Sequence, residues 1–442
     1  MHVTSAARRM PLEDHVEDAV ALLAMVRSRE VIALDGAAHG RVAAAPLRSL
    51  VDVPGLDDSQ MDGFAVAAAD LAGDGTAVTL PLGPMIAAGD APSTLAPGTA
   101  RPIMTGAPLP AGADLVVPVE ESAQGRFGPG TKTADGVTLT PASSAPGRFV
   151  RRRGSDTRRG DTVLREDRLL TPARIAHLAA CGLREVEVHA RVRVVVLSTG
   201  SEVRSGAPSG AGAGENAGAG AETAAGLPAE LAAGTRHDAN GPGLAAALTE
   251  AGAEVVHRGA VPDDPAALLA HLRDQVAAHD ADLVVTSGGV SMGAVEVVRQ
   301  SAELPGVVLA FPTLAMQPGG PQGIGTLEAD GRRVPWLAFP GNPVSALLSC
   351  ELIARPALDA PPRRRLRLPV RLEAPEPSPP ALAQYRRARV LPSGAVRLVA
   401  GASSHLIGGY AAADALAIVP VGVDTVHDGD LLETLLIPGG DS

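Results

Sequence analysis

A glycine-rich turn is the strongest chemical signal in the sequence. Residues 286–293 read Thr-Ser-Gly-Gly-Val-Ser-Met-Gly and directly follow the apolar run 282–286. Glycines let the backbone turn sharply, so that several N–H groups of the turn can point at one anion. The turn lacks the spacing and the lysine of a P-loop, and an ordinary strand-to-helix turn is the alternative interpretation. The candidate phosphate-binding residues are Ser287, Gly288, Gly289 and Ser291.

A second turn of this kind, at residues 339–346, reads Phe-Pro-Gly-Asn-Pro-Val-Ser-Ala. Asn342 can cap a helix that begins at Pro343, and the free N–H groups and dipole of that helix would favour an anion; capping alone is the alternative. Both turns follow strands of one predicted parallel sheet, so they open onto its carboxyl edge, where ligands bind in such folds. Together they predict a phosphorylated ligand. The candidate binding residues of this second turn are Pro340, Gly341, Asn342 and Pro343.

Carboxylates near the same edge could hold a metal ion. Glu202 follows the first strand, Asp263 and Asp264 follow the second, and Glu296 lies seven residues after Gly289. Mg²⁺ takes one or two carboxylates together with substrate phosphates and water. We therefore predict Mg²⁺ near Glu202, Asp263 and Glu296. The alternatives are that Asp263 or Asp264 caps the next helix and that the glutamates are solvated charges.

The elements that must position these residues alternate between strand and helix over residues 191–362. This alternation is typical of a three-layer α/β/α doubly wound domain, and continuous apolar runs fit strands that are buried on both faces. The Gly/Ala-rich stretch 205–234 cannot bury enough surface to offset its ordering entropy, so we expect a disordered loop there. The expected strands are 192–197, 253–256, 282–286, 307–311 and 334–339, and the expected helices are 243–251 and 265–279.

The flanking regions predict a multidomain α/β plus β fold. An amphipathic pattern over 11–29 indicates a helix, and short apolar runs between Gly and Pro over 51–153 indicate a small β-rich module. A further helix is expected to begin after the N-cap Thr171 and to end at Gly182. Short strands after residue 361 indicate a terminal β-barrel.

Composition limits the function classes. The 442 residues suggest about three domains, and the net charge of −11 argues against general nucleic-acid binding. No apolar run approaches 18 residues, and the N-terminus lacks the apolar segment of a signal peptide, so we expect a cytoplasmic protein without a membrane partner. Cys181 and Cys350 lie in apolar helical patterns and are expected to be buried thiols.

Six segments, taken in order along the chain, resemble the molybdopterin molybdenumtransferase family, whose relatives include the C-terminal domain of gephyrin. Any one segment is weakly specific, but six in this order are highly specific, and the resemblance runs from Leu12 to the C-terminus. The segments are 53–55 with 59–66, 103–108 with 112–114 and Pro118, 152–154 with Asp156, 198–200 with Glu202, 288–291, and 340–346.

The resemblance implies a homodimer of four-domain subunits, with the active site in a cleft between the sheet domain of one subunit and the β-module of its partner. In the family, the AMP of adenylated molybdopterin is exchanged for molybdate bound by the pterin dithiolene, and the reaction requires a divalent cation such as Mg²⁺. The implied domains are an elongated helical linker (1–50 and 154–190), a cleft-lining β-module (51–153), a molybdopterin-binding α/β domain (191–362) and a C-terminal β-barrel (363–442).

The resemblance also implies roles for residues that look unremarkable by spacing alone. Asp62, Thr105 and Asp156 lie in stretches that by themselves predict surface turns, and they match residues that line the cleft from the partner subunit. Carried over by motif, Asp62, Asp156, Asp263 and Glu296 are the expected catalytic residues, and Glu202, Asp263 and Glu296 the expected metal ligands. The further cleft positions are Asp238, Asn240, Ser291, Pro340, Pro343 and Ser404.

The chain departs from the family pattern where two catalytically relevant lysines are expected. Thr313 and Gln317 stand in their place, and Lys132 is the only lysine in the chain. Molybdate would therefore need another positive partner, and Arg299, which lies close in sequence, is the predicted substitute. The family's Asp at the glycine turn is Glu296 here.

Three alternative functions are consistent with these observations. The first is molybdate insertion, with the molybdopterin adenylyltransferase and apo molybdoenzymes as expected partners. The second is a non-catalytic molybdopterin carrier, which the missing lysines favour. The third is adenylyl transfer to molybdopterin, because that enzyme resembles the sheet domain alone; the additional β-modules argue against it.

Overall fold

The computed structural model describes residues 9–123, 125, 136–204, 232–291 and 296–438. Contacts divide the chain into two compact units, Met1–Ser28 with Ala190–Ser442, and Arg29–His189. Most of the stretch that we predicted to be a disordered loop, residues 205–231, lies outside the described residues, as does Lys132. None of the described helices combines the length and the apolar character that crossing a bilayer requires.

The first unit is built on a six-stranded sheet with the strand order β15-β12-β16-β20-β19-β17. The pairs β12–β15, β12–β16 and β16–β20 are parallel, and β19 is antiparallel to both of its neighbours. The predicted strands are therefore confirmed, with β19 in addition. Their bounds are β12 (Arg193–Thr199), β15 (Glu254–Val261), β16 (Leu283–Ser287), β17 (Val307–Ala310), β19 (Gly323–Ala329) and β20 (Arg332–Phe339).

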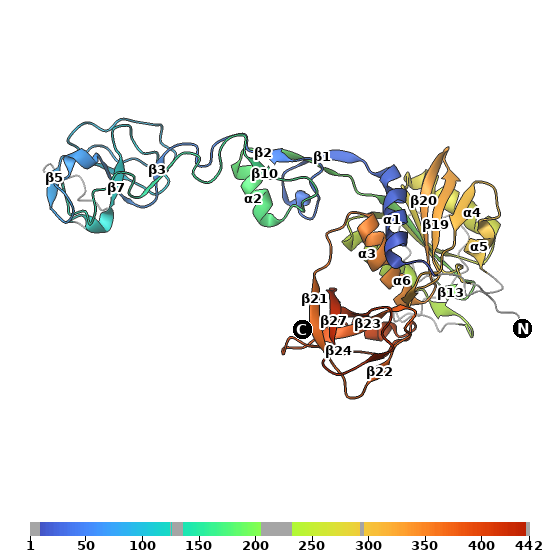
Figure 1. The fold of residues 1–442 in the computed structure, drawn as a ribbon. Coiled ribbons are helices and arrows are strands. Elements are labelled where there is room, and N and C mark those ends of the chain that lie inside the picture. Colours follow the sequence, from blue (N-terminus) through green and yellow to red (C-terminus); the bar gives the residue numbers. More distant parts are fainter. Residues whose placement is uncertain (1–8, 124, 126–135, 205–231, 292–295, 439–442) are drawn as a thin grey trace, which may run out of the picture. The chain divides into compact units, whose positions relative to one another are not determined.

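Helices cover both faces of this sheet, which confirms the predicted three layers (Figure 1). Because side chains alternate along a strand, Val194 and Val196 of β12 pack with α1, α3 and α6, whereas Val195 and Leu197 pack with α4 and α5. The helices are α1 (Leu12–Leu23), α3 (Asn240–Glu250), α4 (Pro265–His279), α5 (Val297–Ser301) and α6 (Pro343–Ser349), which continues into a π-helix, η5 (Cys350–Ala354), and α7 (Arg355–Ala357).

The strand β19 makes the sheet mixed rather than entirely parallel, because it lies antiparallel between β20 and β17. It forms a hairpin with β20 in which Ala329 faces Arg332 across a two-residue turn. Asp330 and Gly331 fill the turn with φ values of 49° and 71°. Asp-Gly suits a tight hairpin because both central residues of such a turn take positive φ. The sequence pattern did not predict this strand, because its glycines weaken the alternation of apolar residues.

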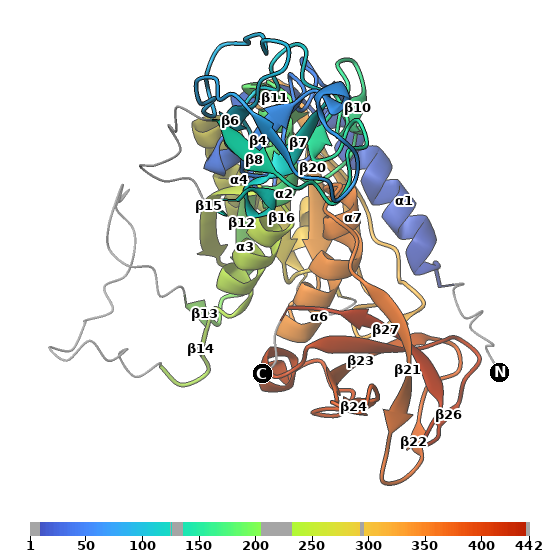
Figure 2. The same ribbon diagram turned by 90° about the vertical axis from the view of Figure 1, so that its left-hand side faces the viewer.

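The C-terminal part of the first unit is the predicted β-barrel (Figure 2). It has five strands and is closed, because β23 pairs with both β24 and β25. A short strand before it, β18 (Met316–Gln317), pairs in parallel with β23 and so ties the sheet domain to the barrel. The barrel strands are β21 (Arg365–Arg371), β23 (Ala383–Val390), β24 (Val396–Leu398), β25 (Ala415–Val419) and β27 (Leu431–Leu436); β22 (Glu376–Pro377) pairs with β26 (Thr425–Val426), and α8 (Ile407–Ala411) precedes β25.

The second unit contains the predicted β-rich module and helix. Thr171 caps α2 (Pro172–Ala180) by accepting a hydrogen bond from the Arg174 N–H, as expected from the sequence. In the module, β4 lies between β6 and β7, with Phe64 fully buried. The strands are β1 (Arg29–Ala33) with β11 (Glu185–His189), β2 (Leu47–Arg48) with β10 (Thr162–Leu164), β3 (Asp58–Ser59) with β9 (Val150–Arg151), β5 (Val78–Leu80) with β8 (Val137–Leu139), and β4 (Gly63–Val66) with β6 (Arg101–Ile103) and β7 (Leu115–Pro118).

Both cysteines are buried and free. Cys181 follows α2, and Cys350 begins the π-helix. Burial raises the pKa of the Cys350 thiol to about 12, so that it stays protonated and behaves as a small apolar side chain. The predicted structural role of these thiols is therefore confirmed.

Candidate functional site

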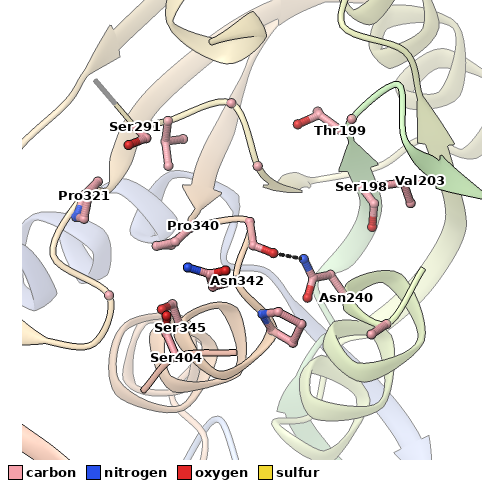
Figure 3. Close-up of a pocket in the computed structure, with 18 of the residues that line it drawn as sticks. Ser198, Thr199, Val203, Asn240, Ser291, Pro321, Pro340, Asn342, Ser345 and Ser404 are labelled. Carbon is pink, nitrogen blue, oxygen red and sulfur yellow. Dashed lines mark hydrogen bonds between the residues drawn. The ribbon is translucent and has the colours of Figure 1, made fainter. Parts of the chain in front are cut away.

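A cavity of about 700 Å³ opens at the carboxyl ends of three parallel strands. The strands β12, β16 and β20 end at Thr199, Ser287 and Phe339, and the segments that follow them line the cavity. The cavity therefore lies at the sheet edge where the sequence predicted a ligand site. Figure 3 shows the neutral polar side chains that surround it, among them Ser291, Asn342, Ser345 and Ser404.

The glycine turn after β16 can be made only by glycine. Gly288 and Gly289 have φ values of +102° and +67°. A Cβ atom on Gly288 would lie 2.5 Å from Thr199 Oγ1 and 2.9 Å from the Thr199 carbonyl oxygen, and one on Gly289 would lie 2.9 Å from the Val298 nitrogen. The turn is therefore packed against β12 and α5, and its backbone is held in one conformation at the cavity wall.

The two predicted anion-binding turns lie against each other. The Gly288 N–H donates to the Phe339 carbonyl at 2.9 Å, and Ser287 Oγ donates to the Pro340 carbonyl at 3.0 Å. Asn240 Nδ2 completes the junction by donating to Ser287 Oγ at 2.8 Å. It also donates to the Gly341 carbonyl at 2.7 Å, the hydrogen bond that Figure 3 shows. Ser287 is buried and does not line the cavity, so its hydroxyl joins the turns rather than facing a ligand.

The start of α6 differs from the predicted cap. The Asn342 side chain makes no capping hydrogen bond. Instead, the Ser404 carbonyl, which comes from the barrel, accepts a hydrogen bond from the Val344 N–H at 3.3 Å. The Asn342 side chain is exposed and lines the cavity, so its amide is accessible to a ligand.

The carboxylates divide between the cavity and the helix cap. Asp264 caps α4 by accepting from the Ala267 N–H at 2.7 Å, which leaves Asp263 for the cavity. Asp263 Oδ2 accepts from the Ser201 N–H at 2.9 Å, and the Asp263 N–H donates back to Ser201 Oγ at 3.2 Å. Glu296 Oε2 accepts from the Ser291 N–H at 3.0 Å. These carboxylates are thus oriented by backbone groups at the cavity wall.

The three predicted metal ligands, Glu202, Asp263 and Glu296, all line this cavity. Within the described part of the chain, however, no three Asp, Glu, His or Cys side chains are close enough to hold a metal ion by themselves. The carboxylates that line the cavity are of the kind that Mg²⁺ takes one or two at a time, together with substrate phosphates and water.

Two acceptor oxygens at the cavity lack partners among the described residues. Asp238 Oδ1 accepts from Ser198 Oγ at 2.8 Å and from the Gly241 N–H at 2.9 Å, but its Oδ2 is buried without a hydrogen bond. Asn240 Oδ1 is likewise buried and unsatisfied. Because unsatisfied buried polar atoms are costly, these two residues suit a ligand that supplies donors.

The comparisons with known proteins cover nearly the whole chain. Residues 10–182 match the family model described as MoeA N-terminal region (domain I and II), and residues 195–360 match the probable molybdopterin binding domain. The chain is 38% identical over 410 residues to Molybdopterin molybdenumtransferase 2 of Mycobacterium tuberculosis strain H37Rv, which covers 90% of this chain and 92% of that protein. The chain belongs to the molybdopterin molybdenumtransferase family.

Further relatives agree with this assignment. The molybdopterin molybdenumtransferase of Synechococcus elongatus is 32% identical over 89% of this chain and 91% of its own length. The crystal structure of the molybdopterin biosynthesis MoeA protein from Pyrococcus horikoshii superposes with a TM-score of 0.73 at 26% identity, covering 97% of this chain and 99% of that one. The fold and the family expected from the sequence are thus confirmed, and molybdenum cofactor biosynthesis is the biological context of this family.

Within this family member, a barrel loop supplies one wall of the cavity. Ala402, Ser403 and Ser404 line the cavity, and only Ser404 was predicted. Arg387 of β23, which is 1% exposed, holds the loop because its Nη2 donates to the carbonyls of Ala400 at 3.2 Å and Ser403 at 3.0 Å. Burial lowers the pKa of the Arg387 guanidinium below its ordinary value, and the charge of Arg386 lowers it further.

The residues predicted to act from the partner subunit lie in the second compact unit. Asp62 Oδ1 accepts hydrogen bonds from both the N–H and the hydroxyl of Thr105, at 2.7 and 2.9 Å. Asp156 is exposed, and its N–H donates to the Val53 carbonyl at 3.1 Å. The hydrogen bonds orient Asp62 and Thr105 as a pair, and the role of all three in a cleft stays a prediction.

The positions that replace the family's lysines differ in their placement. Gln317 lines the cavity, whereas Thr313 and Arg299 do not. The Arg299 guanidinium lies 4.5 Å from the ring centre of Phe311, and its Nε donates to the Val290 carbonyl at 3.0 Å. Arg299 therefore supports the glycine turn from behind, and the described cavity lining contains no lysine.

Proposed function

We propose that this protein inserts molybdate into adenylated molybdopterin and releases AMP. The observation that supports this most strongly is the meeting of two tight turns and three carboxylates at one cavity. Relatives that span almost the entire chain carry the name molybdopterin molybdenumtransferase. A cavity of about 700 Å³ is in the size range of sites for ligands of this kind.

Phosphate recognition is assigned to backbone and neutral side chains. The turn at Gly288 and Gly289 presents main-chain groups without intervening side chains, and Ser291 and Asn342 flank it. Such preorganised donors stabilise charge without reorganising during the reaction. Asp238 and Asn240 would accept hydrogen bonds from N–H or O–H groups of the same ligand.

The carboxylate side of the cavity is assigned to the metal. Glu202, Asp263 and Glu296 supply the oxygen ligands that Mg²⁺ prefers. When bound, Mg²⁺ would offset the negative charge of the phosphoanhydride. The backbone hydrogen bonds to Asp263 and Glu296 fix these carboxylates, so that their orientation need not change when the substrate enters.

We further propose a cytoplasmic homodimer in which Asp62, Thr105 and Asp156 orient the substrate from the partner subunit. The Asp62–Thr105 hydrogen bonds give one Asp62 oxygen a fixed position and leave the other oxygen for a ligand. Transfer of the pterin from a molybdopterin adenylyltransferase, and delivery of the product to apo molybdoenzymes, complete the proposed pathway.

The test is a reconstituted transfer. Purified full-length protein receives adenylated molybdopterin, Mg²⁺ and molybdate, and two products are measured: free AMP and the activity of an added apo molybdoenzyme. We expect both to rise together and to require the metal. Tight binding of the pterin without AMP release would contradict the proposed activity and support the carrier function. The observation that favours a carrier is that the described cavity lining contains no lysine.

A further inference from the structure

Positive charge is scarce in the described wall of the cavity. Four carboxylates line it, and the only Lys or Arg side chain among the described lining residues is Arg236; His237 is the only histidine. The lining carboxylates are Glu202, Asp238, Asp263 and Glu296. An anionic ligand that enters the cavity is therefore repelled by an excess of negative charge. The guanidinium of Arg236 is the charged group of the described lining that can offset this repulsion.

The backbone of Arg236 is fixed at the rim of the cavity. Arg236 begins β14 (Arg236–His237), which pairs in parallel with β13 (Val203–Arg204) so that Val203 faces Arg236 (Figure 2). The Arg236 N–H donates to the Glu202 carbonyl at 2.9 Å. The side chain is thus attached next to a predicted metal ligand, two residues before Asp238.

The guanidinium itself is available to a ligand. Arg236 is exposed, and its side chain has no hydrogen-bond or ion-pair partner among the described residues. Arg204, on the paired strand, differs from Arg236 in its position and in its partners. It does not line the cavity, and its Nη1 donates to the carbonyls of Ser201 at 2.7 Å and Val203 at 3.1 Å. Two arginines on adjacent strands therefore have different surroundings, and only Arg236 faces the cavity unpaired.

We propose, on the basis of the function proposed above, that Arg236 binds a tetrahedral oxyanion of the ligand, phosphate or molybdate. A planar guanidinium offers two parallel N–H donors to such an anion, which fixes its orientation as well as its charge. Arg236 thereby supplies the positive charge that was predicted of Arg299. Arg299 cannot supply it, because its side chain contacts Phe311 and the Val290 carbonyl and does not line the cavity. It is a substrate-binding residue whose position in this chain compensates for the neutral Gln317.

The experiment compares the full-length protein with Arg236→Gln, Arg236→Lys and Arg204→Gln. Equilibrium binding of AMP, of molybdate and of uncharged adenosine is measured by calorimetry at low and high salt. Arg236→Gln should weaken the binding of at least one anion about tenfold at low salt, and by a smaller factor at high salt because exposed charges are screened. Arg236→Lys should recover part of the loss, and adenosine binding and the Arg204→Gln variant should be unaffected.

The two anions distinguish the sources of the oxyanion. A loss confined to AMP places the ligand phosphate at Arg236, a loss confined to molybdate places the metal oxyanion there, and either supports the proposal. Equal anion affinities for the wild-type protein and both glutamine variants would overturn it, as would absence of anion binding by the wild-type protein. AMP release in the reconstituted transfer is measured separately. An Arg236→Gln enzyme that releases AMP with an unchanged KM would refute the role of Arg236 but not the proposed function.

Discussion

Replacing Gly288 with alanine tests whether the glycine turn is held as closely as the structure indicates. The new Cβ would lie 2.5 Å from Thr199 Oγ1 and 2.9 Å from the Thr199 carbonyl oxygen, in a residue whose φ is +102°. The hydroxyl can rotate away, but the carbonyl belongs to β12 and cannot. We expect a loss of about 3 kcal/mol in the free energy of unfolding, made up of backbone strain and steric overlap in comparable parts.

A second glycine separates the two contributions. Gly252 has a similar φ of +95°, but a Cβ there would have no atom within 4 Å. Gly252→Ala therefore carries the backbone strain alone and should cost about 1 to 2 kcal/mol. The difference between the two variants gives the cost of the overlap with Thr199.

The assay uses the single tryptophan of the chain. Trp336 is fully buried in β20, and its Nε1 donates to Thr286 Oγ1 at 2.9 Å, two residues before Gly288. Its fluorescence in a urea titration reports the unfolding of the sheet domain, and AMP release reports the turn itself. If Gly288→Ala were no less stable than Gly252→Ala and still released AMP at the wild-type rate, the close packing of the turn on β12 would be refuted.

Three further predictions concern the carboxylates, the barrel loop and acid stability. Asp263→Asn should lower AMP release at least about a hundredfold without changing the oligomeric state, whereas Asp264→Asn, which keeps a good helix cap, should not; equal rates would remove Asp263 from the proposed metal role. Arg387→Met should raise the KM for substrate several-fold without changing the unfolding followed by Trp336, because only the barrel loop loses its anchor; an unchanged KM would contradict this. Burial lowers the pKa of His15 from 6.5 to about 4, so its neutral form stabilises the fold fully above pH 6.5 and loses that effect as the pH falls towards 4. His15→Leu should therefore remove about 2 kcal/mol of the decrease in unfolding free energy between pH 7 and pH 5, and an equally steep decrease in the variant would exclude this origin.

Much of the site could be predicted because parallel strands bring distant residues to one edge. The turns at Gly288 and Gly341 are more than 50 residues apart, yet both follow strands of the same sheet, and the Gly288 N–H bonds to the residue that ends β20. The segments that follow β12 and β15 meet for the same reason, as the hydrogen bonds between Ser201 and Asp263 show. Order along the chain is enough to predict such meetings.

Other features depend on contacts that no local pattern encodes. Asn342 has the residue type and the position of a helix cap, but the Ser404 carbonyl from the barrel takes a free N–H of that helix. Arg387 looks like a surface residue of a strand, and its burial becomes evident only when the barrel closes around it. By contrast, Asp330-Gly331 is a readable hairpin signal, and the strand before it was missed because Gly323 and Gly325 interrupt its apolar pattern.

The barrel loop that Arg387 holds has a consequence for engineering the protein. The sheet domain supplies the turns and the carboxylates, whereas residues 402–404, which form part of the cavity wall, belong to the loop between β24 and α8. Loops of different length or polarity that keep the Ser404 carbonyl could therefore be grafted between β24 and α8 to change which ligands are admitted, while the glycine turn keeps its hydrogen bonds to β20. In such chimeras, the selectivity of the cavity for its ligands could be varied independently of the folding of the sheet domain.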